Sequence, residues 1–157
     1  MTMALLIGLL GAAVLAIEQK AVPQFKVLNP EGAAMTSRQL STQSRWVLFY
    51  VTPRCRPCDS ILRAMKDWDS PMLPARVVVI VRGPLADASA YVEARRPQQL
   101  SAMAWFADPT DDAWKALELK GTPVLIGVQD GVMKWAIAGV LNNPRMVESV
   151  VRTWVSQ

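Results

Sequence analysis

The chain has 157 residues, enough for one compact domain of ordinary size and a short appendage. Apolar residues make up 52% of it and charged residues 19%, which supports a packed core and excludes global disorder. The net charge of +4 comes from scattered lysines and arginines without a basic run, so the sequence does not indicate a nucleic-acid-binding protein.

Histidine is absent, and the two cysteines are Cys55 and Cys58. The lack of histidine excludes Ser-His-Asp and Cys-His catalytic sites and the usual zinc and copper sites. Two thiolates cannot hold an iron–sulfur cluster within one chain, and Asp59 after Cys58 excludes a CxxCH haem-attachment motif. We therefore expect no metal and no cofactor, which leaves dithiol chemistry.

Residues 1–17 contain no charged side chain and one polar side chain, that of Thr2. A helix of that length spans about 25 Å, slightly less than the roughly 30 Å hydrocarbon core of a bilayer. Residues 1–20 are predicted to be a hydrophobic helix that serves as a signal-anchor or as a signal peptide cleaved after small residues. A buried first helix is the remaining alternative, although an all-apolar helix needs a larger surround than a domain of this size offers.

The first half of the folded part contains two predicted buried strands. Short extended pieces and a turn over 25–32 lead to the apolar run 46–51, which is typical of a strand covered on both faces. Residues 77–81 are predicted to form the second buried strand. Between the two strands, helical spacing predicts a helix that two prolines end; its apolar residues are Ile61, Leu62, Met65 and Trp68, and the prolines are Pro71 and Pro74.

The second half alternates between helices and strands. A helix capped by Asp87 and running to Arg96, a strand at 102–106 and a short helix with Asp111 and Asp112 in its first turn are expected. A hairpin over 124–137 follows, with its turn at 130–131. A last helix begins at Asn143-Pro144, with Met146, Val147, Val150, Val151, Trp154 and Val155 on its apolar face. This order predicts an α/β fold with a central mixed sheet flanked by helices.

The Cys55-Arg56-Pro57-Cys58 motif lies at a predicted strand-to-helix junction. There the first sulfur lies by the helix N-terminus, where free N–H groups favour a thiolate, so Cys55 is the predicted nucleophile and Cys58 the resolving cysteine. Arg54, Arg56 and Pro57 are predicted to tune the pKa of Cys55. The alternatives are a structural disulfide, a pair of inert thiols or a metal half-site shared between chains. A structural disulfide across so short a loop would stabilise the fold little, because it removes little chain entropy.

The segment Trp46–Ile61 resembles the active-site segment of thioredoxin-like proteins. Lys120–Val124, followed by Asp130-Gly131 and Gly139, is similar to the second signature of that superfamily, the cis-proline loop and its hairpin. The resemblance implies a thioredoxin-like fold in which Pro123 packs against the CxxC. It also implies that the backbone of Thr122 pairs with bound substrate.

Two further segments narrow the resemblance. Residues 21–32 are similar to the N-terminal extension of TlpA-like proteins. The predicted strand and helix between 81 and 121 are similar to the central insertion of the same proteins. Residues 48–55 look like the active-site approach of MauD, a membrane-anchored accessory protein of methylamine dehydrogenase maturation. The resemblance covers 21–157, the predicted thioredoxin-like domain. Arg54 stands where thioredoxins usually have Trp, and Phe49 where they have a buried Asp that assists proton transfer at the second cysteine.

We therefore expect an extracytoplasmic thiol–disulfide oxidoreductase that matures specific redox or disulfide-containing proteins. Its partners would be protein thiol or disulfide clients and a membrane or periplasmic redox protein. It would be anchored in the inner membrane facing the periplasm, or secreted to the periplasm after signal cleavage. The alternative is a non-catalytic client-binding maturation or assembly factor. Copper delivery is disfavoured because histidine is absent.

Overall fold

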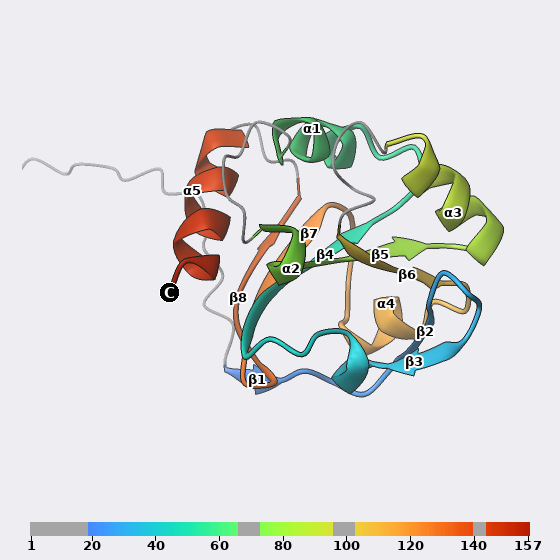
Figure 1. Ribbon diagram of the computed structural model, residues 1–157, viewed down its shortest axis with the longest axis horizontal. Coiled ribbons are helices and arrows are strands. Elements are labelled where there is room, and N and C mark those ends of the chain that lie inside the picture. Colours follow the sequence, from blue (N-terminus) through green and yellow to red (C-terminus); the bar gives the residue numbers. More distant parts are fainter. Residues whose placement is uncertain (1–18, 66–72, 96–102, 140–143) are drawn as a thin grey trace, which may run out of the picture.

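A central mixed sheet organises the protein (Figure 1). The computed structural model describes residues 19–65, 73–95, 103–139 and 144–157. Within these ranges the strand order is β1-β8-β7-β4-β5-β6-β2-β3. The strands are β1 Lys20–Ala21, β2 Lys26–Leu28, β3 Ala34–Thr36, β4 Arg45–Val51, β5 Val77–Arg82, β6 Ala104–Asp108, β7 Val124–Gln129 and β8 Val132–Ala138.

Helices cover both faces of this sheet. They are η1 Ser37–Gln39 (a 3-10 turn), α1 Arg56–Met65, α2 Leu73–Arg76, α3 Leu85–Glu93, α4 Asp112–Ala116 and α5 Pro144–Val155. Buried side chains of α1, α3 and α5 share one apolar cluster on one face. The buried Ala113 of α4 belongs to a second cluster on the other face. The predicted α/β architecture, a mixed sheet between helical layers, is confirmed.

Strand β4 lies at the centre of the sheet and is buried on both faces. It pairs in parallel with β5 and antiparallel with β7. Its side chains alternate between the two clusters: Val47, Phe49 and Val51 face α1 and α5, and Trp46, Leu48 and Tyr50 face α4. Because neither face meets water from Trp46 to Val51, the strand needs apolar residues at each of these positions, which explains its unbroken run.

Three local predictions are wrong. Helix α3 begins at Leu85 after Pro84, whose ring fixes the extended entry, so Asp87 lies in the first turn rather than at the cap. Pro74, which is predicted to end the preceding helix, lies inside the short helix α2. Met146 is 42% exposed, because the buried stripe of α5 runs along Val147 and Val151 and leaves Met146 about 100° to one side.

Several predicted features lie outside the described residues, namely the apolar segment 1–17, Trp68, Pro71, Arg96 and Asn143. The described chain begins beside the sheet, where Lys20 of β1 pairs with Met133 of β8. None of the helices in the described ranges has the length and apolar character needed to cross a bilayer.

Asp108 is a fully buried acid at the end of β6. Its carboxylate accepts hydrogen bonds from the Tyr50 hydroxyl at 2.7 Å and from the backbone N–H groups of Asp112 at 2.8 Å and Trp114 at 3.0 Å. These bonds join β4, β6 and α4. Burial, followed by the hydrogen bond to Asp108, raises the pKa of Tyr50 above its usual range, so this phenol stays a donor.

Replacing Asp108 with alanine should lower the free energy of unfolding by roughly 3–5 kcal/mol, because the buried Tyr50 hydroxyl and two half-buried backbone N–H groups lose their acceptor. Tyr50→Phe is the matched control and should lower the free energy of unfolding by about 1 kcal/mol, since both backbone N–H groups still donate to the Asp108 carboxylate. Denaturant unfolding followed by circular dichroism measures both. Equal losses in the two variants would contradict this account of Asp108.

Candidate active site

The two cysteines lie where the central strand passes into helix α1. The Cys55 N–H donates to the Thr52 carbonyl at 3.2 Å, and the Cys55 carbonyl accepts the Asp59 N–H at 3.1 Å, so Cys55 caps the helix. Pro57 occupies the first turn, where its missing N–H needs no intrahelical partner. The local sequence therefore fixes the first sulfur at the positive end of α1.

Cys55 and Cys58 form a disulfide, with their Cα atoms 5.2 Å apart. The Cys58 N–H also points at the Cys55 sulfur, 3.2 Å away. Cys55 is 9% exposed and Cys58 is 0% exposed. Both cysteines belong to the apolar cluster under α1, but Cys55 keeps a small exposed surface that an incoming thiolate can approach, whereas Cys58 keeps none.

Arg54 and Arg56 flank Cys55 in sequence, and both of their side chains are exposed. Arg54 adopts the left-handed backbone conformation with φ of 68°, which is uncommon for a residue other than glycine. Within the described ranges neither arginine forms an ion pair. Both positive charges are therefore available to a thiolate or to an incoming molecule.

The loop before β7 lies beside the active-site turn. The Thr122–Pro123 peptide bond is cis, and Pro123 is buried. Pairing of β4 with β7 puts Tyr50 opposite Val124, so the residues just beyond these two meet as well. The hydroxyls of Thr52 and Thr122 are 2.8 Å apart. The structure thus brings Thr122 next to the turn that carries Cys55.

Phe49 is fully buried in the same cluster as the two cysteines. The resemblance gives thioredoxins an acid at this place, where it assists the second cysteine. Here the position is apolar. The acid next to Cys58 in sequence is Asp59, and its side chain turns toward α3 instead.

Asp59 belongs to an ionic cluster that joins α1 to α3 and that the sequence did not reveal. Its carboxylate pairs with Arg95 at 2.8 Å and accepts the Tyr91 hydroxyl at 3.3 Å. The Arg95 guanidinium lies 3.6 Å from the Tyr91 ring centroid. Burial raises the pKa of Tyr91, although the charge of Arg95 opposes the rise. No local pattern marks this cluster, because its partners are far apart in the chain.

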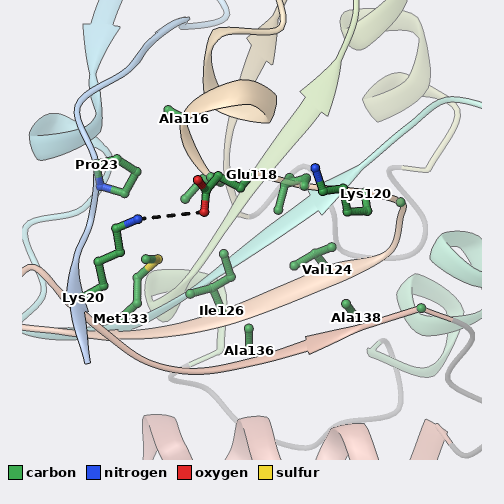
Figure 2. Close-up of a pocket in the computed structure, with 14 residues that line it drawn as sticks. Lys20, Pro23, Ala116, Glu118, Lys120, Val124, Ile126, Met133, Ala136 and Ala138 are labelled. Atoms are coloured by element: carbon green, nitrogen blue, oxygen red, sulfur yellow. Dashed lines mark ion pairs between the residues drawn. The ribbon is translucent and has the colours of Figure 1, made fainter. Parts of the chain in front are cut away.

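A hollow in the described structure is lined by none of the residues of the active-site turn (Figure 2). It measures about 670 Å³, and its floor includes Val124, Ile126 and Met133. These three belong to the α4 side of the sheet, whereas the cysteines belong to the α1 side. Figure 2 shows the Lys20–Glu118 pair, 3.9 Å apart, at this hollow.

No group of three or more potential metal-ligating side chains occurs in the ranges that the structure describes.

Comparison with known proteins identifies the fold. No family model and no curated protein matches the sequence. Among solved structures, the chain is similar to a secreted Mycobacterium tuberculosis disulfide oxidoreductase homologous to E. coli DsbE, with 17% identity over 83% of this chain and 96% of that chain and a TM-score of 0.65. A Thermus thermophilus thio-disulfide isomerase matches with 17% identity over 87% and 96% of the two chains and a TM-score of 0.62.

The M. tuberculosis peroxidoxin BcpB also matches, with 12% identity over 88% of this chain and 96% of that chain and a TM-score of 0.68. These likenesses show a thioredoxin-like fold, as the sequence predicted. Proteins described as an oxidoreductase, an isomerase and a peroxidoxin share this fold. The fold alone therefore does not determine the activity, which depends on the residues of the site.

Replacing both Arg54 and Arg56 with glutamine should raise the pKa of the reduced Cys55 thiol, because two positive charges that stabilise its thiolate are lost. The pH dependence of thiolate absorbance measures this pKa. Arg38→Gln, at an exposed position on η1, is the single-charge control and should leave it unchanged. An unchanged pKa in the double variant would contradict the predicted tuning role.

Proposed function

We propose that this chain is a thiol–disulfide oxidoreductase that exchanges disulfides with protein clients. The difference between the two cysteines carries the proposal: Cys55, at the N-terminus of α1, keeps 9% of its surface exposed, and Cys58 beside it keeps 0%. A purely structural disulfide would gain little from so short a loop. The asymmetry fits a pair in which one thiol attacks and the other resolves.

The exchange proceeds in two steps. In the reduced protein the Cys55 thiolate attacks a client disulfide, forms a bond to one client sulfur and releases the other as a thiolate. Cys58, after losing its proton, then attacks the Cys55 sulfur. This closes the Cys55–Cys58 disulfide and releases the second client thiolate, so the client gains two electrons. The reverse sequence oxidises a client dithiol.

Thr122 and Pro123 are proposed to hold the client during this exchange. Their loop lies beside the active-site turn, tied to it by the hydroxyl contact between Thr52 and Thr122. An extended client segment bonded to Cys55 would pair with the backbone of Thr122, as the resemblance implies. Backbone pairing selects an extended client without reading its side chains.

Specialised clients fit the site better than general reduction does. Phe49 supplies no carboxylate to take the proton of Cys58, so resolution of the mixed disulfide is expected to be slow. A slow second step suits an enzyme that stays bound to one or few maturing proteins. The TlpA-like or MauD-like membrane-anchored type belongs to this proposal.

An extracytoplasmic location is supported by the uncharged residues 1–17 and by the DsbE homologue among the similar structures, which is described as secreted. We place the domain in the periplasm, held at the inner membrane by the N-terminal segment or released by its cleavage. Fractionation followed by carbonate extraction tests this. Recovery of the full chain in the cytosol would contradict it.

Cys58→Ser should trap a client on Cys55 as a stable mixed disulfide, because the enclosed resolving thiol is gone while the accessible nucleophile remains. Cys55→Ser is the matched control and should trap none, since Cys58 is 0% exposed. Non-reducing gels after acid quenching detect the adduct. Trapping in neither variant, or equal trapping in both, would contradict the proposed mechanism.

The Cys55→Ala/Cys58→Ala variant separates this enzyme from a non-catalytic assembly factor. It should bind clients but fail to support their maturation, since no thiol remains to exchange. Normal maturation by this variant would favour the assembly factor instead. The reduction potential of the wild-type pair, measured in glutathione buffers, then gives the direction: near about −270 mV it reduces clients, and near about −120 mV it oxidises them.

A further inference from the structure

We infer that the site prefers client disulfides flanked by acidic side chains, and that Arg54 and Arg56 are its specificity-determining residues. The inference rests on the proposed function and adds a substrate class to it. The charges around Cys55 that remain unpaired in the structure support it.

The unpaired cations beside Cys55 are the two arginines that flank it in the active-site turn. The side chains of Arg54 and Arg56 are both exposed. Neither forms an ion pair within the described ranges. Their charges add to the positive end of α1, which points at the same sulfur.

The acid nearest to Cys55 in sequence is neutralised by another cation. Asp59 pairs with Arg95, with Nη2 and Oδ1 2.8 Å apart. Asp87 in the first turn of α3 is exposed and forms no ion pair in the part of the chain that the structure describes. Among the described residues, the unpaired charges beside Cys55 and in the adjoining hollow are therefore those of Arg54, Arg56 and Asp87, two positive and one negative.

A hollow beside Arg54 leaves room for a client side chain. It measures about 610 Å³ and is lined by Pro53, Arg54, Asp87, Ala90, Tyr91 and Arg95. Arg95 offers little free charge there, because its Nε and Nη2 groups hold Asp59 and its Nη1 donates to the Tyr91 carbonyl. Arg54 is thus the cation in this hollow that is open to an incoming carboxylate.

Guanidinium groups and carboxylates match in geometry and charge. A guanidinium can donate two parallel hydrogen bonds to one carboxylate, which gives both affinity and orientation. A client joined to Cys55 carries its neighbouring residues only about 3.3 Å apart per position, so their side chains lie within reach of Arg54 and Arg56. Acidic neighbours would speed the encounter, and basic neighbours would be repelled.

The test uses the full chain in mild detergent and three short peptides, each a disulfide-linked homodimer. The peptides differ in the residues beside the cysteine, which are Glu, Ser or Lys. The rate constant of the reduced protein with each peptide is divided by that of dithiothreitol with the same peptide, which removes intrinsic reactivity. The Glu peptide should exceed the Lys peptide about tenfold at low ionic strength, and the ratio should shrink at about 0.5 M salt.

Variants assign this preference to residues. Arg54→Gln/Arg56→Gln should reduce the Glu-to-Lys ratio at least about threefold, whereas Asp87→Asn should increase it. The ratio is unaffected by a general change in Cys55 nucleophilicity, which alters both rates alike. Lys26→Gln/Arg38→Gln removes the same net charge from exposed positions on β2 and η1, away from α1 (Figure 1), and should leave the ratio unchanged.

Three results would overturn the inference: equal normalised rates for the Glu and Lys peptides, a ratio that survives in Arg54→Gln/Arg56→Gln, or an equal loss in the control variant. In each case the Ser peptide would still be reduced, so the proposed oxidoreductase would stand. Failure of the wild-type chain to reduce even the Ser peptide would instead contradict the proposed function.

Discussion

Antiparallel pairing of β4 with β7 is the interaction on which the rest of the site depends. Both strands are buried in the middle of the sheet, and their register fixes how their ends meet. Strand β4 ends in the turn that carries Cys55, and β7 begins just after the cis-proline loop. A one-residue slip would turn every side chain of one strand to the opposite face, so the two apolar clusters enforce the register. The sheet thereby brings Thr122 to Thr52 without help from either loop.

Helix α1 supplies the second constraint, because it gives the two cysteines different environments. Cys55 caps the helix and reaches the surface, whereas Cys58 lies one turn into it and faces the core. This difference follows from the amphipathic helix itself, since its buried stripe continues through Ile61 and Leu62. The same packing that stabilises the helix therefore gives the two cysteines the different exposures on which their proposed roles, attack and resolution, rest.

The surroundings of the disulfide are polarised in an unusual way. Beneath it lies an apolar layer with Phe49 where an acid would ease proton transfer, and around it lie unpaired cations. Asp59, the acid next to Cys58 in sequence, pairs with Arg95 and accepts the Tyr91 hydroxyl, and these contacts join α1 to α3. In the proposed function, these two features together would stabilise the Cys55 thiolate and attract an anionic client, and they would not favour rapid turnover.

The sequence by itself determined the order of the elements, the buried strands, the redox pair and the identity of the first sulfur as the one at the helix N-terminus. Those features are local, because periodicity, turn residues and a two-residue spacing act within a few positions of the chain. Only the tertiary structure decided that Asp59 pairs with Arg95, that Asp108 is satisfied by Tyr50, and that Met146 faces water. These depend on how helices rotate and strands align against distant neighbours, and no short window of sequence contains that information.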